Sequence, residues 1–209
     1  MKKTEKISGT RRMTGMAILT AIVIVLQLLG SFIRFGTFSI SLVLIPIVVG
    51  AALYGAYAGA WLGFVFSVVV LIMDSAAFLA VNPAGTIVTV LVKGTLAGYL
   101  AGLVYQLLSK TGIFLVIEAN DKAVWRTDLG VAASAIICPI VNTGLFLLGC
   151  VLFFLPTINE WASAAGYSNA GKFMIFALVG GNFLFELLFN IIFSPLIVRL
   201  IKIGRKSGV

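Results

Sequence analysis

Six apolar blocks, separated by short polar or glycine-containing segments, follow one another along the 209-residue chain. The blocks are close in length to the roughly 20 residues that an α-helix needs to cross the hydrocarbon core of a bilayer. The predicted spans cover residues 14–33, 38–54, 57–73, 87–108, 129–153 and 173–201. The pattern predicts an all-α membrane protein, a bundle of six transmembrane helices that forms one membrane domain over residues 1–209.

The connections between the blocks differ in character. Residues 34–37 form the first predicted turn, and Gly55 with Ala56 makes a very short link between the second and third spans. The predicted loop 74–86 contains Asn-Pro-Ala-Gly at 82–85, a strong turn signal. The fifth span is interrupted by Pro139, and residues 154–172 are predicted to form a long loop before the sixth span.

The composition excludes an ordinary soluble domain, because charged residues make up only 11% of the chain, against about 25% in average soluble proteins. The net charge of +8 comes from basic residues that gather in residues 1–12, 109–128 and 199–206. Of the basic residues, only Arg34 and Lys172 are predicted to lie on the opposite side of the bundle. The positive-inside rule therefore predicts that both termini are cytoplasmic, and nucleic acid is not an expected partner.

Several kinds of chemistry are absent from the sequence. The chain has no histidine, which argues against zinc hydrolases and Ser-His triads. It carries no P-loop GxxxxGK[ST] that would hold ATP phosphates, and no HExxH or GxSxG motif. We therefore expect no metal, no cofactor and no enzymatic activity, and a chain that cannot energise itself with ATP by that route.

Among the ionisable residues inside predicted spans, Lys93 and Glu186 stand out. Such residues cost about 2.5–3.5 kcal/mol on insertion scales and are functional candidates by default. At a rise of about 1.5 Å per residue, Gln27 and Lys93 lie about 9 Å below the outer ends of their spans, Asn182 about 14 Å and Asn142 about 16 Å. Four helices thus bring polar side chains into one layer of the outer half of the bundle.

This layer has two interpretations. Glu186 lies one helical turn below Asn182 on the same face, and Asn82 lies in the loop above, so the layer is typical of a pocket for a polar solute that opens to the outside. Alternatively, Lys93 pairs with Glu186 and the amides bond across helices, so that the layer only holds the bundle together. The two interpretations are compatible, because a buried pair can also orient a pocket.

Small residues recur at four-residue spacing on three predicted helices. The rows are Gly55, Gly59 and Gly63; Gly94, Gly98 and Gly102; and Ala17 with Ala21. In lipid such rows allow helix backbones to approach closely. We expect the glycine rows to hold the bundle together, whereas the Ala17/Ala21 face is a candidate for either packing or contact with a partner protein.

Over nearly its whole length the chain resembles the substrate-binding S components of energy-coupling factor (ECF) vitamin transporters. The resemblance rests on six spans with both termini inside, and on the motifs AILTA at 17–21, IPIVVGA at 45–51 followed by YG at 54–55, and LVKG at 91–94 followed by Gly98 and Gly102. It implies a multi-pass protein of the bacterial plasma membrane that binds a water-soluble vitamin near the outer face. It also implies docking on a membrane coupling (T) subunit through Ala17 and Ala21, with two cytosolic ATPase subunits driving transport.

Three segments are similar to the pantothenate-type branch of these proteins: NPAGT at 82–86, CPIVNTG at 138–144, and GGNF at 180–183 with Glu186. The predicted substrate-binding residues are Gln27, Asn82, Lys93, Asn142, Asn182 and Glu186. A lysine and several amides suit pantothenate, whose carboxylate would find a counter-charge in Lys93.

Other readings stay open at this point. Glu186 keeps thiamine or another cation as an alternative ligand, and riboflavin and folate are further options. The chain is otherwise a stand-alone carrier in which Lys93 and Glu186 relay a proton or ion, or an assembly protein without a ligand.

Overall fold

The computed structural model describes residues 9–32, 34–35, 38–39, 42–110 and 122–206. In chain order the elements are α1 (Gly9–Phe32), β1 (Arg34–Phe35), β2 (Phe38–Ser39), α2 (Leu44–Tyr54), α3 (Ala56–Met73), α4 (Ala76–Val81), α5 (Pro83–Lys110), α6 (Lys122–Phe153), α7 (Leu155–Ala164), α8 (Ala170–Phe173), the π-helix η1 (Met174–Val179) and α9 (Gly180–Lys206). Within this described part of the chain, five helices are long and apolar enough to cross a membrane, and α2 is a shorter apolar helix. The predicted all-α membrane bundle is confirmed.

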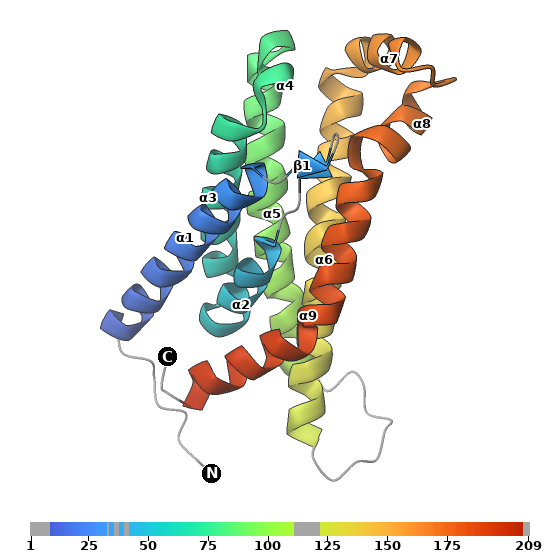
Figure 1. The fold of residues 1–209 in the computed structure, drawn as a ribbon. Helices are drawn as coiled ribbons and strands as arrows, with labels where there is room; N and C mark the ends of the chain where they lie inside the picture. Colours follow the sequence, from blue (N-terminus) through green and yellow to red (C-terminus); the bar gives the residue numbers. More distant parts are fainter. Residues whose placement is uncertain (1–8, 33, 36–37, 40–41, 111–121, 207–209) are drawn as a thin grey trace.

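Helix α1 begins and helix α9 ends at one end of the bundle, whereas α4 and α7 lie at the opposite end (Figure 1). The main apolar core is built mostly from α2, α3, α5, α6 and α9, with Leu44, Leu62 and Ile197 among its fully buried side chains, and α1 contributes Val23. Part of the basic sequence behind the predicted orientation, in residues 1–8 and 111–121, lies outside the described residues.

The second span is shorter than predicted. Helix α2 begins at Leu44 rather than at Phe38, because Phe38–Ser39 pairs with Arg34–Phe35 as an antiparallel ladder. A short apolar run cannot be identified as strand or helix from its composition alone. The late start also places Pro46 in the first turn of α2, where its missing N–H has no intrahelical partner to lose.

Two predicted loops contain helices. The segment 74–86 holds α4 and the first residues of α5, and the segment 154–172 holds α7 and the start of α8. The predicted interruption at Pro139 is wrong as well, because α6 continues through this residue as one helix. Proline is tolerated inside transmembrane helices where neighbouring groups satisfy the freed carbonyl. Helix α9 contains Pro195 and turns across the inner end of the bundle (Figure 1).

A single π-helical turn, η1, precedes α9. Its hydrogen bonds join residues five apart and accommodate an extra residue, a feature that is frequent at functional sites. A side chain at Gly180, the first residue of α9, would collide with the carbonyl oxygen of Ile175. Glycine has no Cβ and avoids this collision, so it allows the π turn to form at this position.

The glycine rows lie where α3 crosses α5. A Cβ at Gly63 would collide with the carbonyl oxygen of Gly94, and one at Gly59 with that of Gly98. These collisions involve backbone atoms, which cannot swing away as a flexible side chain can. The glycines therefore allow the two helices to touch backbone to backbone, as expected for small-residue faces in membranes.

We expect Gly63→Ala to lower the midpoint of thermal unfolding in detergent, because overpacking a tight contact costs about 1–3 kcal/mol. Gly144→Ala is the matched control, since no atom lies within 4 Å of a Cβ built at Gly144. The measurement is a thermal-unfolding curve for each variant beside the wild type. Equal midpoints for the two variants would contradict the proposed role of the α3–α5 crossing.

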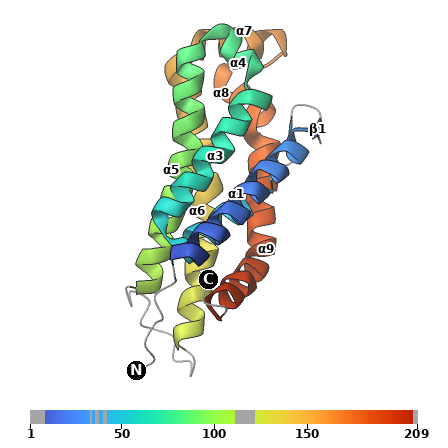
Figure 2. The same ribbon diagram turned by 90° about the vertical axis from the view of Figure 1, so that its left-hand side faces the viewer.

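Helix α1 lies on the outside of the bundle, at the left in Figure 1, and runs obliquely across the front in Figure 2. Its buried residues are Val23, Gln27, Gly30 and Ser31, all in its outer half. Two of these side chains are polar, so the outer half of α1 is held by hydrogen bonds as well as by apolar packing. At the inner end, Arg12 donates a hydrogen bond of 3.1 Å to the carbonyl oxygen of Tyr54, the last residue of α2.

Candidate ligand-binding site

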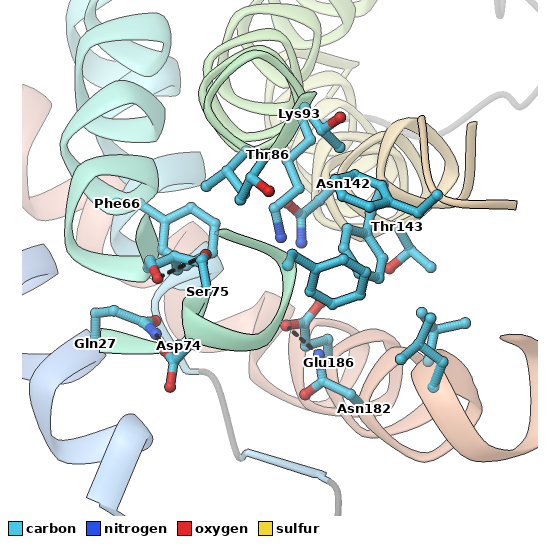
Figure 3. Close-up of a pocket in the computed structure, with 18 residues that line it drawn as sticks. Gln27, Phe66, Asp74, Ser75, Thr86, Lys93, Asn142, Thr143, Asn182 and Glu186 are labelled. Carbon is cyan, nitrogen blue, oxygen red and sulfur yellow. Dashed lines mark hydrogen bonds between the residues drawn. The ribbon is translucent and has the colours of Figure 1, made fainter. Parts of the chain in front are cut away.

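A cavity of about 220 Å³ lies among the outer parts of the helices (Figure 3). Its walls come from α1, α3, α4, α5, α6, η1 and α9. The lining residues are Gln27, Phe66, Val70, Asp74, Ser75, Phe78, Thr86, Thr89, Val90, Lys93, Asn142, Thr143, Phe146, Phe154, Leu178, Val179, Asn182 and Glu186. The wall contains both polar and apolar side chains, which suits a small ligand with both polar and apolar parts.

Lys93 enters the cavity from α5 between two aromatic rings. Its Nζ lies 5.0 Å from the centre of the Phe146 ring and 5.9 Å from the centre of the Phe66 ring. A cation over an aromatic face is attracted by the ring quadrupole. The rings thus hold the ammonium group in place without neutralising its charge.

Glu186 faces the same cavity from α9 and is almost completely buried, with 1% of its surface exposed. Its Oε1 accepts a hydrogen bond of 3.1 Å from Nδ2 of Asn182, one turn above. Its Oε2 has no hydrogen-bond partner among the described residues. Lys93 and Glu186 therefore share a cavity, and this carboxylate oxygen is not engaged by the lysine.

Amides surround Glu186 from two helices. Asn182 and Asn142 line the cavity from α9 and α6, and the Oδ1 atom of each is buried without a hydrogen-bond partner in the described part of the chain. Asn190, one turn below Glu186, donates to the Glu186 carbonyl oxygen at 2.8 Å and does not line the cavity. An unmatched buried acceptor costs about 1–3 kcal/mol, so these oxygens favour a state in which a donor reaches them.

Asp74 joins the cavity wall to α1. Its Oδ2 accepts hydrogen bonds from Gln27 Nε2 at 3.0 Å and from Ser31 Oγ at 2.7 Å. Asp74 ends α3 as its C-cap residue, and both Asp74 and Gln27 line the cavity. Ser75, the next residue, donates to the carbonyl oxygen of Val70 at 3.0 Å, which closes the end of α3.

Aromatic rings cover the outer part of the site. The ring of Phe78, on α4, packs edge to face against Phe146, Phe154 and Trp161, with centroids 5.6, 5.1 and 5.5 Å away. Such T-shaped pairs are favoured beyond the area that they bury. Through these rings Phe78 connects α4 to α6 and α7 above the cavity.

The structure brings together Gln27, Lys93, Asn142, Asn182 and Glu186 among the predicted binding residues. Asn82 is not brought into this group. Its Oδ1 accepts a hydrogen bond from the backbone N–H of Gly85 at 3.0 Å, and its carbonyl oxygen accepts one from the Thr86 hydroxyl at 2.8 Å. Asn82 therefore caps the start of α5, where Pro83 takes the first helical position.

Sequence reasoning missed several lining residues. Asp74 directly follows a predicted span, where an acidic residue is not unusual. The one indication of its role in the sequence is that this position lies at the outer end of the bundle, beside the predicted polar layer. Threonine is common in transmembrane helices, so the sequence did not mark Thr86, Thr89 and Thr143 as residues of a site. The aromatic wall could not be selected from 16 phenylalanines in the chain.

Ala17 and Ala21 lie elsewhere on the molecule. Both are exposed on α1 and do not line the cavity. Thr20, between them, accepts a hydrogen bond of 3.2 Å from Nε1 of Trp61 on α3. The Ala17/Ala21 face is thus available on the outside of the bundle and is tied to α3 beside it.

The comparisons with known proteins agree with this fold. A family model described as the substrate-specific component of ECF transporters matches residues 11–201. No curated protein matches the chain. The solved structure of ThiT from Listeria monocytogenes has the same fold, with a TM-score of 0.64 and 20% sequence identity over 94% of this chain and 96% of that chain. Because the family match extends over most of the sequence, the chain belongs to the family of ECF transporter substrate-specific components, multi-pass proteins of the bacterial cell membrane.

Proposed function

We propose that the chain captures a small water-soluble vitamin, with pantothenate as the first candidate, and delivers it together with a membrane coupling subunit and two cytosolic ATPases. The observation that carries this proposal is Lys93, a cation held between aromatic rings in the wall of a cavity near the outer end of the bundle. An ammonium group in this position is a partner for an anionic ligand group.

The remainder of the wall supports the same class of ligand. Pantothenate has one carboxylate, one amide, two hydroxyl groups and a branched apolar centre. The carboxylate is matched by Lys93, the hydroxyl and amide N–H groups by the unsatisfied oxygens of Asn142 and Asn182, and the apolar centre by Phe66 and Phe146. The volume of about 220 Å³ is below the roughly 300–1,000 Å³ of sites for drug-sized molecules, which favours a compact vitamin over riboflavin or folate.

A cationic vitamin such as thiamine is the second candidate. The Glu186 Oε2, which has no hydrogen-bond partner among the residues that the structure describes, and the aromatic rings around the cavity favour it, because a carboxylate and aromatic faces both attract a cation. Against it, Lys93 would lie in the same small cavity as the positive charge of the ligand. That repulsion makes the anionic ligand our preferred assignment.

The experiment that tests the proposal identifies the ligand directly. The chain is purified in detergent and denatured, and the released small molecules are analysed by mass spectrometry. Pantothenate at close to one molecule per chain supports the proposal. A different vitamin keeps the transport role and replaces the substrate, and no bound molecule together with no thermal shift across a vitamin panel contradicts a vitamin-binding role.

The two candidate ligands respond differently to Glu186→Gln. For pantothenate we expect the dissociation constant to rise no more than about tenfold, because the amide keeps the hydrogen-bonding oxygen and a neutral hydrogen bond contributes about 0.5–1.5 kcal/mol. A cationic ligand would lose its counter-charge and bind much more weakly. Isothermal titration with pantothenate and thiamine, on wild type and variant, distinguishes the two results.

A further inference from the structure

Helix α1 has an unusual means of attachment at its outer end. Ser31 and Gln27 are one turn apart on the same face of α1, and both donate to a single oxygen, Oδ2 of Asp74. Gln27 also donates to Ser31 Oγ at 3.3 Å, which closes the group into a triangle. Since each of the two helix residues is buried, the hydrogen bonds to the partly exposed Asp74 are shielded from water on the α1 side and fix the position of the α1 face relative to the end of α3.

The same carboxylate belongs to the ligand cavity. Asp74 and Gln27 are both lining residues, whereas Ser31 is not. Any ligand that fills this side of the cavity therefore meets a group that also holds α1. Asp74 can therefore connect ligand binding to the position of α1, because a change in the contacts of its carboxylate on the cavity side alters its hydrogen bonds to α1.

We propose that Asp74 is a positioning residue that couples the cavity to helix α1, the helix that bears Ala17 and Ala21. The inference rests on the proposed function, delivery together with a coupling subunit, and on the docking role of these alanines that the family resemblance implies. Through Ser31 and Gln27, Asp74 fixes the outer half of α1 from within the cavity wall. The hydrogen bond between Trp61 and Thr20 then ties the middle of α1 to α3 beside the alanine face.

The direct test measures the position of α1 in the ligand-free protein. Spin labels are placed at Leu29→Cys on α1 and Leu148→Cys on α6, which are 53% and 51% exposed, while both native cysteines are buried. Pulsed electron-resonance spectroscopy then gives the distribution of distances between the labels. We expect a narrow distribution for the otherwise unaltered chain, and a broader, shifted one for Asp74→Ala.

Ser31→Ala is the more discriminating variant, because Ser31 is outside the cavity lining and the change removes the 2.7 Å hydrogen bond to Asp74 and the 3.3 Å bond from Gln27 while the carboxylate itself is kept. We expect it to broaden the distribution in the same direction as Asp74→Ala, and to weaken pantothenate binding about threefold to tenfold by releasing the carboxylate. Ser163→Ala is the matched control, since the Ser163 hydroxyl bonds within α7 only and is exposed.

The outcomes separate this inference from the choice of ligand. Distributions for Asp74→Ala and Ser31→Ala that equal those of the Ser163→Ala control would overturn the positioning role, whatever the ligand is. A wild-type chain that does not bind pantothenate would refute the proposed vitamin, and the distance distributions would still decide the role of Asp74. Pantothenate binding that Ser31→Ala leaves unchanged would overturn the coupling between cavity and helix.

Discussion

Replacement of Lys93 by alanine is expected to weaken pantothenate binding about tenfold to a hundredfold, measured by isothermal titration in detergent. The reason is the loss of a charge-assisted hydrogen bond, which contributes about 1.5–3 kcal/mol and hence about that factor in the dissociation constant. The effect should be large because the rings of Phe66 and Phe146 hold the ammonium group in place before the ligand arrives.

Two controls separate the loss of charge from the loss of fold. Lys172→Ala removes an exposed lysine that does not line the cavity, so its affinity should equal that of the wild type. Lys93→Met keeps most of the side-chain volume and removes the charge, so it should bind as weakly as Lys93→Ala. Unchanged affinity in a folded Lys93→Met chain would show that the ligand does not bind through this cation.

Introduction of a bulky residue on the Ala17/Ala21 face is expected to abolish vitamin uptake and leave vitamin binding intact. A leucine at Ala17 or Ala21 would project from the outside of α1, where close approach of another helix depends on small residues. The cavity is not lined by these alanines, so the dissociation constant of the purified chain should not change. The measurements are uptake in cells that contain the coupling subunits, and titration of the purified variant.

The matched control is Ala164→Leu, the same change at an exposed alanine on α7, outside the cavity lining. It should preserve both uptake and binding. If Ala17→Leu transports vitamin at the wild-type rate, the docking face lies elsewhere on the molecule. If Ala17→Leu no longer binds vitamin, the residue supports the site rather than the partner contact. Uptake into ATP-free vesicles by this chain alone would favour a stand-alone carrier instead.

The apolar blocks were sufficient to predict the helical bundle, because a bilayer demands a minimum length of apolar helix. The boundaries failed where short-range interactions decide the structure. Phe38–Ser39 forms a strand because a partner strand lies four residues earlier, and α4 and α7 are helices of six and ten residues within segments that were predicted to be loops. Neither the hairpin nor the π turn has a sequence pattern that distinguishes it from an ordinary helix.

The sequence predicted those residues of the site that depth along a helix is enough to identify. A fixed rise per residue brings Gln27, Lys93, Asn182 and Asn142 into one layer, about 9–16 Å below the outer ends of their predicted spans, and the structure places all four in the cavity wall. The depth of a residue does not show where its side chain points. Asn82 was therefore predicted to line the pocket, whereas its side chain caps the start of α5. The aromatic wall depends on how helices face one another, which a single sequence does not contain.

The π turn at Met174–Val179 has a consequence for reading relatives of this chain. A π turn contains about one residue more than the α-helical turn that it replaces, so the loss of one residue here would restore a regular α-helix and leave both flanking segments in place. Family members with and without that residue can therefore present Asn182, Glu186 and Asn190 on the same helix face. An ungapped alignment between two such members would shift these three positions by one residue, which is about 100° around the helix. The alignment would then compare polar residues of one chain with lipid-facing residues of the other.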